Sequence, residues 1–452
     1  MRPPSITRTG APGPAGHVLF GHLGDLRRNP LGFFTSCARD YGPVVRLRAA
    51  AWSAYLVSHP DLVKHVLQDN ARNYSKQNVD YRLLKPVTGD GLLTSEGAHW
   101  YRQRRALQPA FDRQRMATLN AAVTRGAAAM LDRWDRLCDG ARVELTHELA
   151  RPIITIVGET LFGSDLTHDA DRIDAAFRTL NERFGKWTAA SFLPFLVTPG
   201  NLRCHRALRT LNRVAARMMA EWRPAADGPG HVLSLLLPPI DAMNGAPPSR
   251  RQVRDEIVTF LLAGYETTVT ALTWTCYLVA RHPAVDERIQ EELREVAANR
   301  TVTAEDLPRL TYTRMVIEES MRLYPPVWVL SRSPLADDCL DGHRIQAGSI
   351  VFLSPYVTHR LPEWWSDAER FLPERFSPER SSARPRFSYF PFGGGPRVCI
   401  GRHFGMTQAQ LVLAMMLQRY RVTLPSDRPV EPVPLVTLRP RNGLHVELHR
   451  RP

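Results

Sequence analysis

The stretch FPFGGGPRVCIGRHFG, residues 390–405, places one cysteine, Cys399, in a loop with glycines on both sides. The apolar, periodic segment Phe404 to Leu417 follows and predicts a helix. Because the start of a helix presents free N–H groups and a positive dipole end, we expect it to lower the pKa of the Cys399 thiol. Glycines let these amides approach closely, since they have no Cβ. The loop therefore favours a thiolate that acts as a nucleophile, a redox thiol or a metal ligand.

Several known cysteine and glycine sites fit this loop poorly. A structural cysteine does not need so many glycines. A phosphatase-like nucleophile requires an arginine after the cysteine, whereas Arg397 precedes Cys399. A nucleotide-binding loop would need a lysine and a hydroxyl after its last glycine, and both are missing. A thiolate bound to heme iron, where it favours O–O cleavage, remains.

The run Phe392-x-x-Gly395-x-Arg397-x-Cys399-x-Gly401 resembles the heme-binding loop of the cytochrome P-450 family. The resemblance implies heme b, iron protoporphyrin IX, as the cofactor. It implies that Cys399 is the proximal iron ligand, that Phe392 lies beside the sulfur, and that Arg397 meets a heme propionate. Gly395 and Gly401 are then part of the cofactor-binding loop.

A second resemblance lies upstream, where Glu319 and Arg322 match the ExxR pattern of the same family. Their spacing places both side chains on one helix face. By itself the pattern could be an exposed ion pair worth about 0–1 kcal/mol. The segment Pro373–Phe376 resembles the PERF segment of the family, whose arginine joins this pair in a buried cluster behind the heme. We interpret the cluster as scaffold. At Gly405 the chain departs from the family, which more often has alanine, and this concerns only local helix packing.

Further cations are expected to bind the heme propionates. Trp100-x-x-x-Arg104 resembles the helix that contacts propionates in the family, and Arg332 resembles a third propionate arginine. Ordinary surface charge is the alternative for each arginine taken alone. Buried carboxylates need fixed cations, and guanidinium groups suit them better than lysine does.

Residues 257–280 predict one long helix that begins after Pro247 and Pro248 and stops at Pro283. Its segment Ala263–Thr268 resembles the motif that carries oxygen chemistry in the family. The resemblance assigns proton delivery to Glu266 and Thr267. Thr267 could instead simply bond back to the Ala263 carbonyl. Gly264 costs about 1 kcal/mol in a helix interior, and a flat backbone beside the ligand would explain it.

In the rest of the chain, the periodicity of the apolar residues predicts mostly helix and few strands. We expect a hairpin from Val44–Leu47 and Ala54–Val57, a helix from Pro60, and mostly helix over 100–223 with a break around 192–201. Residues 224–250 predict a connection, and short strands are expected near 345–353 and at the C-terminus. The fold class is mainly α with small β-sheet regions: a single cytochrome P-450 domain, residues 1–452, with residues 1–17 flexible and a long central helix.

Composition limits the setting of the protein. Six cysteines without CxxC spacing favour a reducing cytosol, so we expect a cytoplasmic protein. Prolines and glycines interrupt the N-terminus, so no membrane anchor is expected, and Glu266 argues against a span at 257–280. The net charge of +14 fits an acidic partner, a phosphate-rich surface or an arginine-rich proteome.

The residues after Cys399 contain no flavin-binding or iron–sulfur pattern, so we expect electrons from a separate ferredoxin or flavodoxin. Four arginines are assigned by the resemblance to the partner-facing side: Arg102, Arg105, Arg113 and Arg402. Scattered, solvated arginines are the alternative. We expect a monomer.

The resemblance implies a monooxygenase that inserts one oxygen atom from O₂ into a hydrophobic small molecule, such as a terpenoid, a fatty acid or a polyketide-like compound. Parts of residues 75–93 are expected in the substrate pocket together with these side chains: Phe260, Ala263, Val327, Trp328 and Leu435. Trp328 either caps the ligand or packs under the sheet. A heme-thiolate sensor without turnover would not need Glu266 and Thr267. A nucleic-acid binder would cluster its basic residues, which here are spread throughout the chain.

Overall fold

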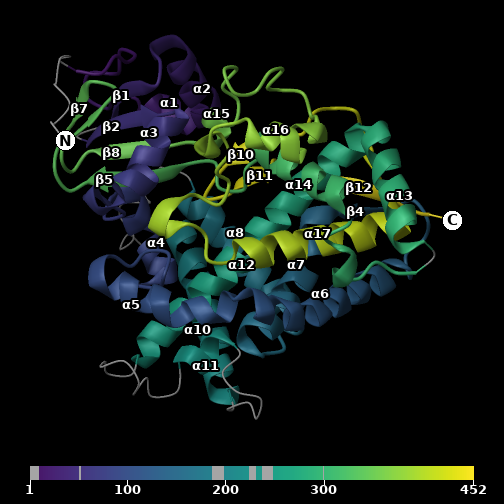
Figure 1. Cartoon of the computed structure of the whole chain (residues 1–452). Coiled ribbons are helices and arrows are strands. Elements are labelled where there is room, and N and C mark those ends of the chain that lie inside the picture. Colours follow the sequence, from purple (N-terminus) through teal and green to yellow (C-terminus); the bar gives the residue numbers. More distant parts are fainter. Residues whose placement is uncertain are drawn as a thin grey trace.

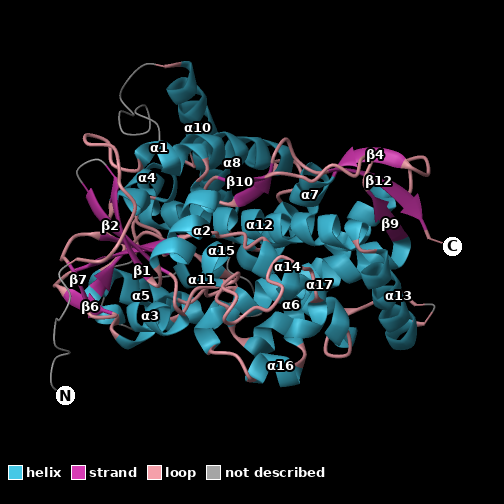
Figure 2. Ribbon diagram, turned by 90° about the horizontal axis from the view of Figure 1, so that it is seen from above, coloured by secondary structure: helices cyan, strands magenta, loops and turns pink. Residues whose placement is uncertain are grey.

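The computed structural model describes residues 10–49, 52–185, 198–222, 231–236, 248–298 and 300–451. Helices form the body of this part of the chain, most strands lie at its two ends, and β10 (Pro432–Pro434) and β11 (Leu438–Pro440) lie between them (Figures 1 and 2). The largest sheet lies near the N-terminus, and a smaller sheet lies beside the C-terminus. The predicted class, mainly α with small sheets, is confirmed.

Helix α12 (Arg250–Arg281) runs through the middle of the body (Figure 1). It starts with a capping box between Ser249 and Gln252, and it ends just before Pro283, which opens the next helix. Both predicted boundaries are confirmed. Its residues are buried nearly all round because helices pack against it on several sides. Its neighbours are α4 (Val79–Thr88), α7 (Leu145–Val157), α10 (Pro199–Glu221), α13 (Pro283–Ala297), α14 (Thr311–Leu323) and α17 (Arg402–Arg419).

The remaining α-helices complete the body and the N-terminal lobe. They are α1 (Leu23–Arg28), α2 (Pro30–Tyr41), α3 (Pro60–Lys64), α5 (Gly97–Leu107), α6 (Arg113–Trp134), α8 (Ala170–Phe184), α11 (Val232–Leu236), α15 (Pro355–Thr358) and α16 (Pro378–Ser382). Two π-helical turns, His65–Asp69 and Gly158–Phe162, extend α3 and α7.

The helical prediction over 100–223 is confirmed apart from one strand, β4 (Ala141–Glu144), which it missed. Of the predicted break, residues 192–197 lie outside the described residues, and α10 already begins at Pro199. Of the predicted connection at 224–250, residues 224–230 and 237–247 lie outside them as well. The apolar run between these two stretches forms α11.

The larger sheet has the order β1-β2-β8-β5-β3. The predicted hairpin is confirmed by β1 (Val44–Ala49) and β2 (Trp52–Val57), which pair antiparallel with Val45 opposite Leu56. Strand β8 (Ile350–Leu353) joins β2 in parallel, β5 (Leu330–Pro334) joins β8 antiparallel, and β3 (Tyr74–Ser75) forms the edge. This sheet carries Arg332 on β5.

The other strands form small antiparallel sheets. Strand β12 (His445–Arg450) pairs with β4 and with β9 (Tyr420–Thr423). Strands β10 (Pro432–Pro434) and β11 (Leu438–Pro440) form a hairpin whose turn contains Leu435, and β6 (Asp338–Leu340) pairs with β7 (His343–Ile345). The strands predicted near 345–353 and at the C-terminus are thus confirmed.

Candidate functional site

The cysteine loop enters α17, whose first residue is Arg402 and whose N-cap is Gly401. The Cys399 amide donates to the Phe392 carbonyl at 2.9 Å, which folds the loop back over itself. The predicted helix after the cysteine is therefore confirmed, and its start lies beside the sulfur.

Gly395 has a steric role in this loop. It has φ +62°, and a Cβ built on it would lie 1.8 Å from the Leu67 carbonyl oxygen. Only glycine allows both this conformation and this approach. Gly395 is not among the residues that line the cavity described below. The structure gives Gly395 a packing role against the His65–Asp69 turn, and its part in the cofactor-binding loop stays a prediction.

The Cys399 thiol does not have the lowered pKa that we expected from the helix end. Although the side chain opens onto the cavity described below, the protein atoms around the sulfur remove enough water to raise its pKa, and this outweighs the Gly401 backbone and the charges of Arg104, Arg402 and Lys76, which lower it. The helix end therefore does not by itself ionise the sulfur. A bound metal ion would deprotonate a ligating thiol directly.

A cavity of about 1120 Å³ lies between the cysteine loop and α12. The Cys399 side chain is exposed to it. Apart from Gly395, every predicted site residue lines this cavity: Trp100, Arg104, Phe260, Ala263, Glu266, Thr267, Val327, Trp328, Arg332, Phe392, Arg397, Cys399, Gly401 and Leu435. Residues more than 300 positions apart in the sequence thus meet at one site.

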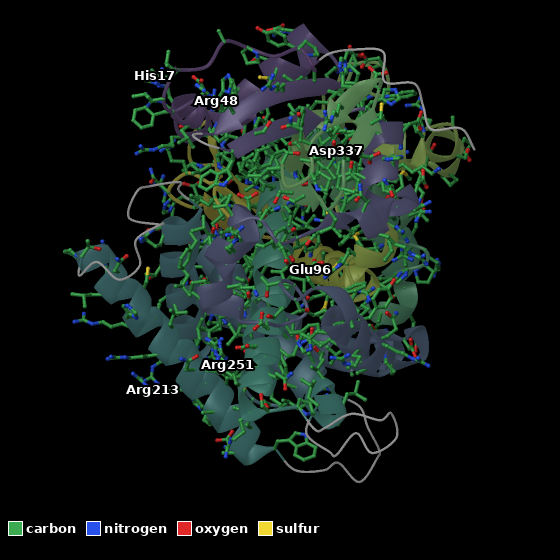
Figure 3. The ribbon with its side chains drawn as sticks, turned by 90° about the vertical axis from the view of Figure 1, so that its left-hand side faces the viewer. His17, Arg48, Glu96, Arg213, Arg251 and Asp337 are labelled. Atoms are coloured by element: carbon green, nitrogen blue, oxygen red, sulfur yellow. The ribbon has the colours of Figure 1, made fainter. Side chains whose placement is uncertain are left out.

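Four cations line one part of the cavity: Lys76, Arg104, Arg332 and Arg397. Glu96, in the middle of the face that Figure 3 shows, is the carboxylate paired with one of them, since it accepts a hydrogen bond from Arg397 at 2.6 Å. Burial lowers the pKa of Arg397 to about 10. Burial and the charges of Arg332 and Arg397 hold the pKa of Lys76 well below its usual range. This crowding of positive charge fits a ligand with acidic groups, such as the propionates of heme.

Each cation is held in place by neutral partners. Arg104 donates to the Val398 carbonyl at 3.0 Å, Arg332 donates to the Ser331 carbonyl at 2.8 Å, and Lys76 donates to the Leu93 carbonyl at 3.0 Å. The Arg397 guanidinium lies 3.8 Å from the centre of the Trp100 ring. Lys76 lies in the segment 75–93, parts of which were expected to line the pocket and do so, but its charge was assigned no role. Glu96 was missed, because no motif surrounds it.

Across the cavity, α12 presents Thr267, whose hydroxyl donates to the Ala263 carbonyl at 2.8 Å. The bond leaves the hydroxyl oxygen free to accept a hydrogen bond. Gly264 lines the cavity, so the flat backbone that we expected there faces the site. A Cβ on it would also lie 3.3 Å from Val157 on α7, so the glycine permits close helix packing as well.

Glu266 is 2% exposed and lies in a polar cluster that ties α12 to α8 and the β10–β11 hairpin. It accepts hydrogen bonds from both Nε and Nη2 of Arg439, from Thr437 at 2.6 Å and from Asn181 at 2.9 Å. Burial opposes its charge, but the attraction and hydrogen bonds of Arg439 prevail and lower the pKa of Glu266. The carboxylate therefore stays ionised. No local sequence signal pointed to Arg439, which follows Glu266 by more than 150 residues.

The part of the cavity wall that was expected to face the substrate is apolar, and its aromatic side chains pack against neighbours. Phe260 stacks on Phe111 with ring centres 5.6 Å apart. Trp328 packs against Phe34 and donates from its indole N–H to the Leu435 carbonyl at 2.8 Å. The ring of Trp328 packs near the sheet, as one interpretation had it, and it also lines the cavity, so its role in capping a ligand stays a prediction.

A sequence profile of the cytochrome P-450 family matches residues 11–446. The chain belongs to the cytochrome P-450 family. It is 36% identical to cyclooctatin synthase of Streptomyces melanosporofaciens, over 95% of this chain and 91% of that protein. It is 34% identical to pentalenene oxygenase of Streptomyces avermitilis, over 97% of each chain. It is also 34% identical to cyclooctat-9-en-7-ol 5-monooxygenase of Streptomyces melanosporofaciens, over 96% of this chain and 93% of that protein.

This cytochrome P-450 is a monooxygenase, and its family uses a heme-thiolate cofactor, O₂ and a redox partner. Behind its cysteine loop, Arg322 donates to both carboxylate oxygens of Glu319 at 2.7 and 2.8 Å. The Arg375 guanidinium lies 3.3 Å from the same carboxylate. All three side chains are buried, so the cluster expected from the ExxR and PERF segments is present.

Three of the predicted partner-facing arginines of this cytochrome P-450, Arg102, Arg105 and Arg402, are exposed. The side chain of Arg113 lies outside the described part of the chain. Among the residues that the structure describes, none of the helices has the length and apolar character needed to cross a bilayer.

Proposed function

We propose that this cytochrome P-450 hydroxylates a cyclic terpenoid, with heme b held by Cys399 and with electrons from a separate ferredoxin or flavodoxin. The single observation that carries the proposal is the cavity. One wall offers Cys399 and a crowded set of cations, and the opposite wall offers Thr267 and apolar side chains. A planar, apolar, doubly acidic group with a metal that accepts a thiolate matches both the shape and the charge of that site.

In this proposal the residues divide the work of holding the cofactor. Cys399 supplies the sulfur ligand, and Arg104, Arg332, Arg397 and Lys76 pair with the propionates. Bound heme supplies the activation of O₂ and the oxidation of a C–H bond, assisted by electron donation from the thiolate. Apolar walls exclude water from the reacting atoms.

Thr267 and Glu266 move protons in the proposed mechanism. The Thr267 hydroxyl donates its hydrogen to the Ala263 carbonyl, so its oxygen can accept a hydrogen bond from a proton donor in the cavity. Glu266 is ionised and neutralised by Arg439. It can therefore take up and pass on a proton only when this ion pair loosens. Arg439 thus joins the proposal as a residue that positions Glu266.

The substrate class follows from the wall and from the relatives. The wall is mostly apolar, so the substrate is hydrophobic. Two relatives are named for oxidation of pentalenene and of cyclooctat-9-en-7-ol, and these names favour a cyclic terpenoid over a fatty acid or a polyketide.

The remaining parts of the proposal concern the setting. Exposed arginines Arg102, Arg105 and Arg402 suit an acidic electron donor, which they would attract at long range. We further propose that the chain works as a single-domain monomer in the cytoplasm.

Turnover with labelled dioxygen tests this proposal. The purified, heme-loaded protein is supplied with a ferredoxin, a ferredoxin reductase, NADPH and a panel of cyclic sesquiterpenes and diterpenes. We expect at least one product to carry a single labelled oxygen, and Cys399→Ser to give none. Heme loading without any labelled product across the panel would refute a terpenoid monooxygenase and favour the sensing alternative.

A further inference from the structure

Three carboxylates line the cavity, and only one of them lacks a cation partner. Glu266 is paired with Arg439, and Glu431 accepts hydrogen bonds from Arg441 at 2.6 and 2.7 Å. Asp80 is different. Within the described residues no arginine, lysine or histidine pairs with it, and the contact that acts on its charge is the Ser331 hydroxyl.

Asp80 belongs to the cavity-facing side of α4. It is the second residue of this helix, and Leu83 and Leu84 follow it by three and four positions, the spacing of neighbours on one helix face. All three side chains line the cavity. Helix α4 also packs against α12, so it is fixed to the helix that carries Thr267.

Ser331 and Asn78 lie beside the Asp80 carboxylate. The Asn78 side-chain amide donates to the Ser331 hydroxyl oxygen at 3.1 Å, and the Ser331 hydroxyl is within reach of two acceptors, the Asn78 Oδ1 at 3.5 Å and the Asp80 carboxylate. Burial raises the pKa of Asp80 to about 6, although the Ser331 hydrogen bond opposes the rise. The carboxylate is therefore the main form at neutral pH, and Ser331 is the one side-chain donor that acts on it within the described residues, so it has lone pairs left to accept from a ligand.

We propose that Asp80 binds a hydroxyl group of an otherwise hydrophobic substrate. This inference rests on the proposed function and names one feature of its substrate. A pure hydrocarbon would displace water from the carboxylate without replacing the lost hydrogen bonds, which is unfavourable. A cationic ligand is disfavoured because Arg27 and Arg28 line the same cavity and the chain carries a net charge of +14. A neutral donor avoids both costs.

A matched control distinguishes ligand binding by Asp80 from a purely structural role at the start of α4. An acid in the first turn stabilises a helix through the dipole. Asp61 occupies the same second position in α3 and is exposed. Asp61→Asn therefore repeats the dipole change without touching the cavity.

Ligand binding to the heme-loaded protein tests the proposal by optical difference spectroscopy. The probes are farnesol, farnesyl methyl ether, which cannot donate, and farnesyltrimethylammonium, which is cationic and cannot bind iron through nitrogen. We expect farnesol to bind about tenfold more tightly than the ether. Asp80→Ala and Asp80→Leu should abolish this preference, whereas Asp61→Asn should keep it.

Each other outcome overturns the inference. If both Asp80 variants still prefer farnesol to its ether, another residue recognises the hydroxyl group. Equal or undetectable binding of farnesol and its ether to the unmodified protein would also contradict a role for Asp80. Asp80-dependent binding that is tightest for the ammonium probe would indicate a cationic substrate instead. Failure of the proposed function would be seen in a different experiment. In turnover with labelled dioxygen, no product would then carry labelled oxygen, whichever probe binds in the spectroscopic test.

Discussion

Replacing Arg439 with methionine should leave the buried Glu266 carboxylate without its cation partner. Glu266 is 2% exposed and receives two of its four hydrogen bonds from this arginine. Methionine fills much of the space but leaves the carboxylate with neutral partners such as Thr437 and Asn181. Removing one partner of a buried ion pair costs about 3–5 kcal/mol. We therefore expect Arg439→Met to lose about that much free energy of unfolding at pH 8.

The loss should depend on pH in a defined direction. In the unmodified protein the pKa of Glu266 is lowered, so its ion pair contributes stability above the ordinary glutamate pKa of about 4.3 and loses it as the pH falls through the folded value. Without Arg439, burial raises the pKa of Glu266. The variant then binds a proton as the pH falls, so its deficit should be smaller at pH 5 than at pH 8.

Urea unfolding of the heme-loaded protein, followed by tryptophan fluorescence at both pH values, measures this. Glu266→Gln combined with Arg439→Met is the control, because it removes both charges and should recover most of the stability at pH 8. An equal loss at pH 5 and pH 8, or no recovery in the double variant, would refute the assignment of Glu266 as an ionised, arginine-held carboxylate.

Further predictions concern the glycines, the cation cluster and the partner surface. Gly395→Ala should prevent stable heme incorporation because its Cβ would meet the Leu67 carbonyl. A Cβ at Gly405 meets nothing within 4 Å. Gly405→Ala should therefore raise the free energy of unfolding by about 0.5–1 kcal/mol in urea titrations. The reverse ranking would contradict both assignments. Lys76→Met should release heme to apomyoglobin about tenfold faster without lowering the stability of the heme-free protein; unchanged release would remove Lys76 from the propionate site. Arg102→Glu should slow electron transfer from an acidic ferredoxin most at low salt, and stopped-flow reduction at two ionic strengths would show whether it does.

The sequence predicted the parts of the site whose information is local. The cysteine loop, the Glu319–Arg322 pair and the boundaries of α12 each depend on spacing within one segment, and capping and proline rules fixed their limits. Strand β4 was missed because its four residues pair with a strand about 300 positions later. Short segments of that kind carry little propensity of their own.

The errors and omissions at the site share a cause. Arg439, Lys76 and Asp80 matter through contacts with residues far away in the sequence, and no single-segment pattern records such contacts. The packing of Gly264 against Val157 was not foreseen because Val157 belongs to another helix. The pKa of the Cys399 thiol was misjudged because the helix end is visible in the sequence, whereas the protein atoms that desolvate the sulfur are not.

The reduced, carbon-monoxide-bound spectrum tests most directly whether Cys399 is the heme ligand. The unmodified protein should show a Soret band far to the red of that of a histidine-ligated heme, because a thiolate pushes electron density onto the iron. Cys399→Ser, refolded or expressed with heme in excess, should lose this band. An identical red-shifted band in the Cys399→Ser variant would contradict the account.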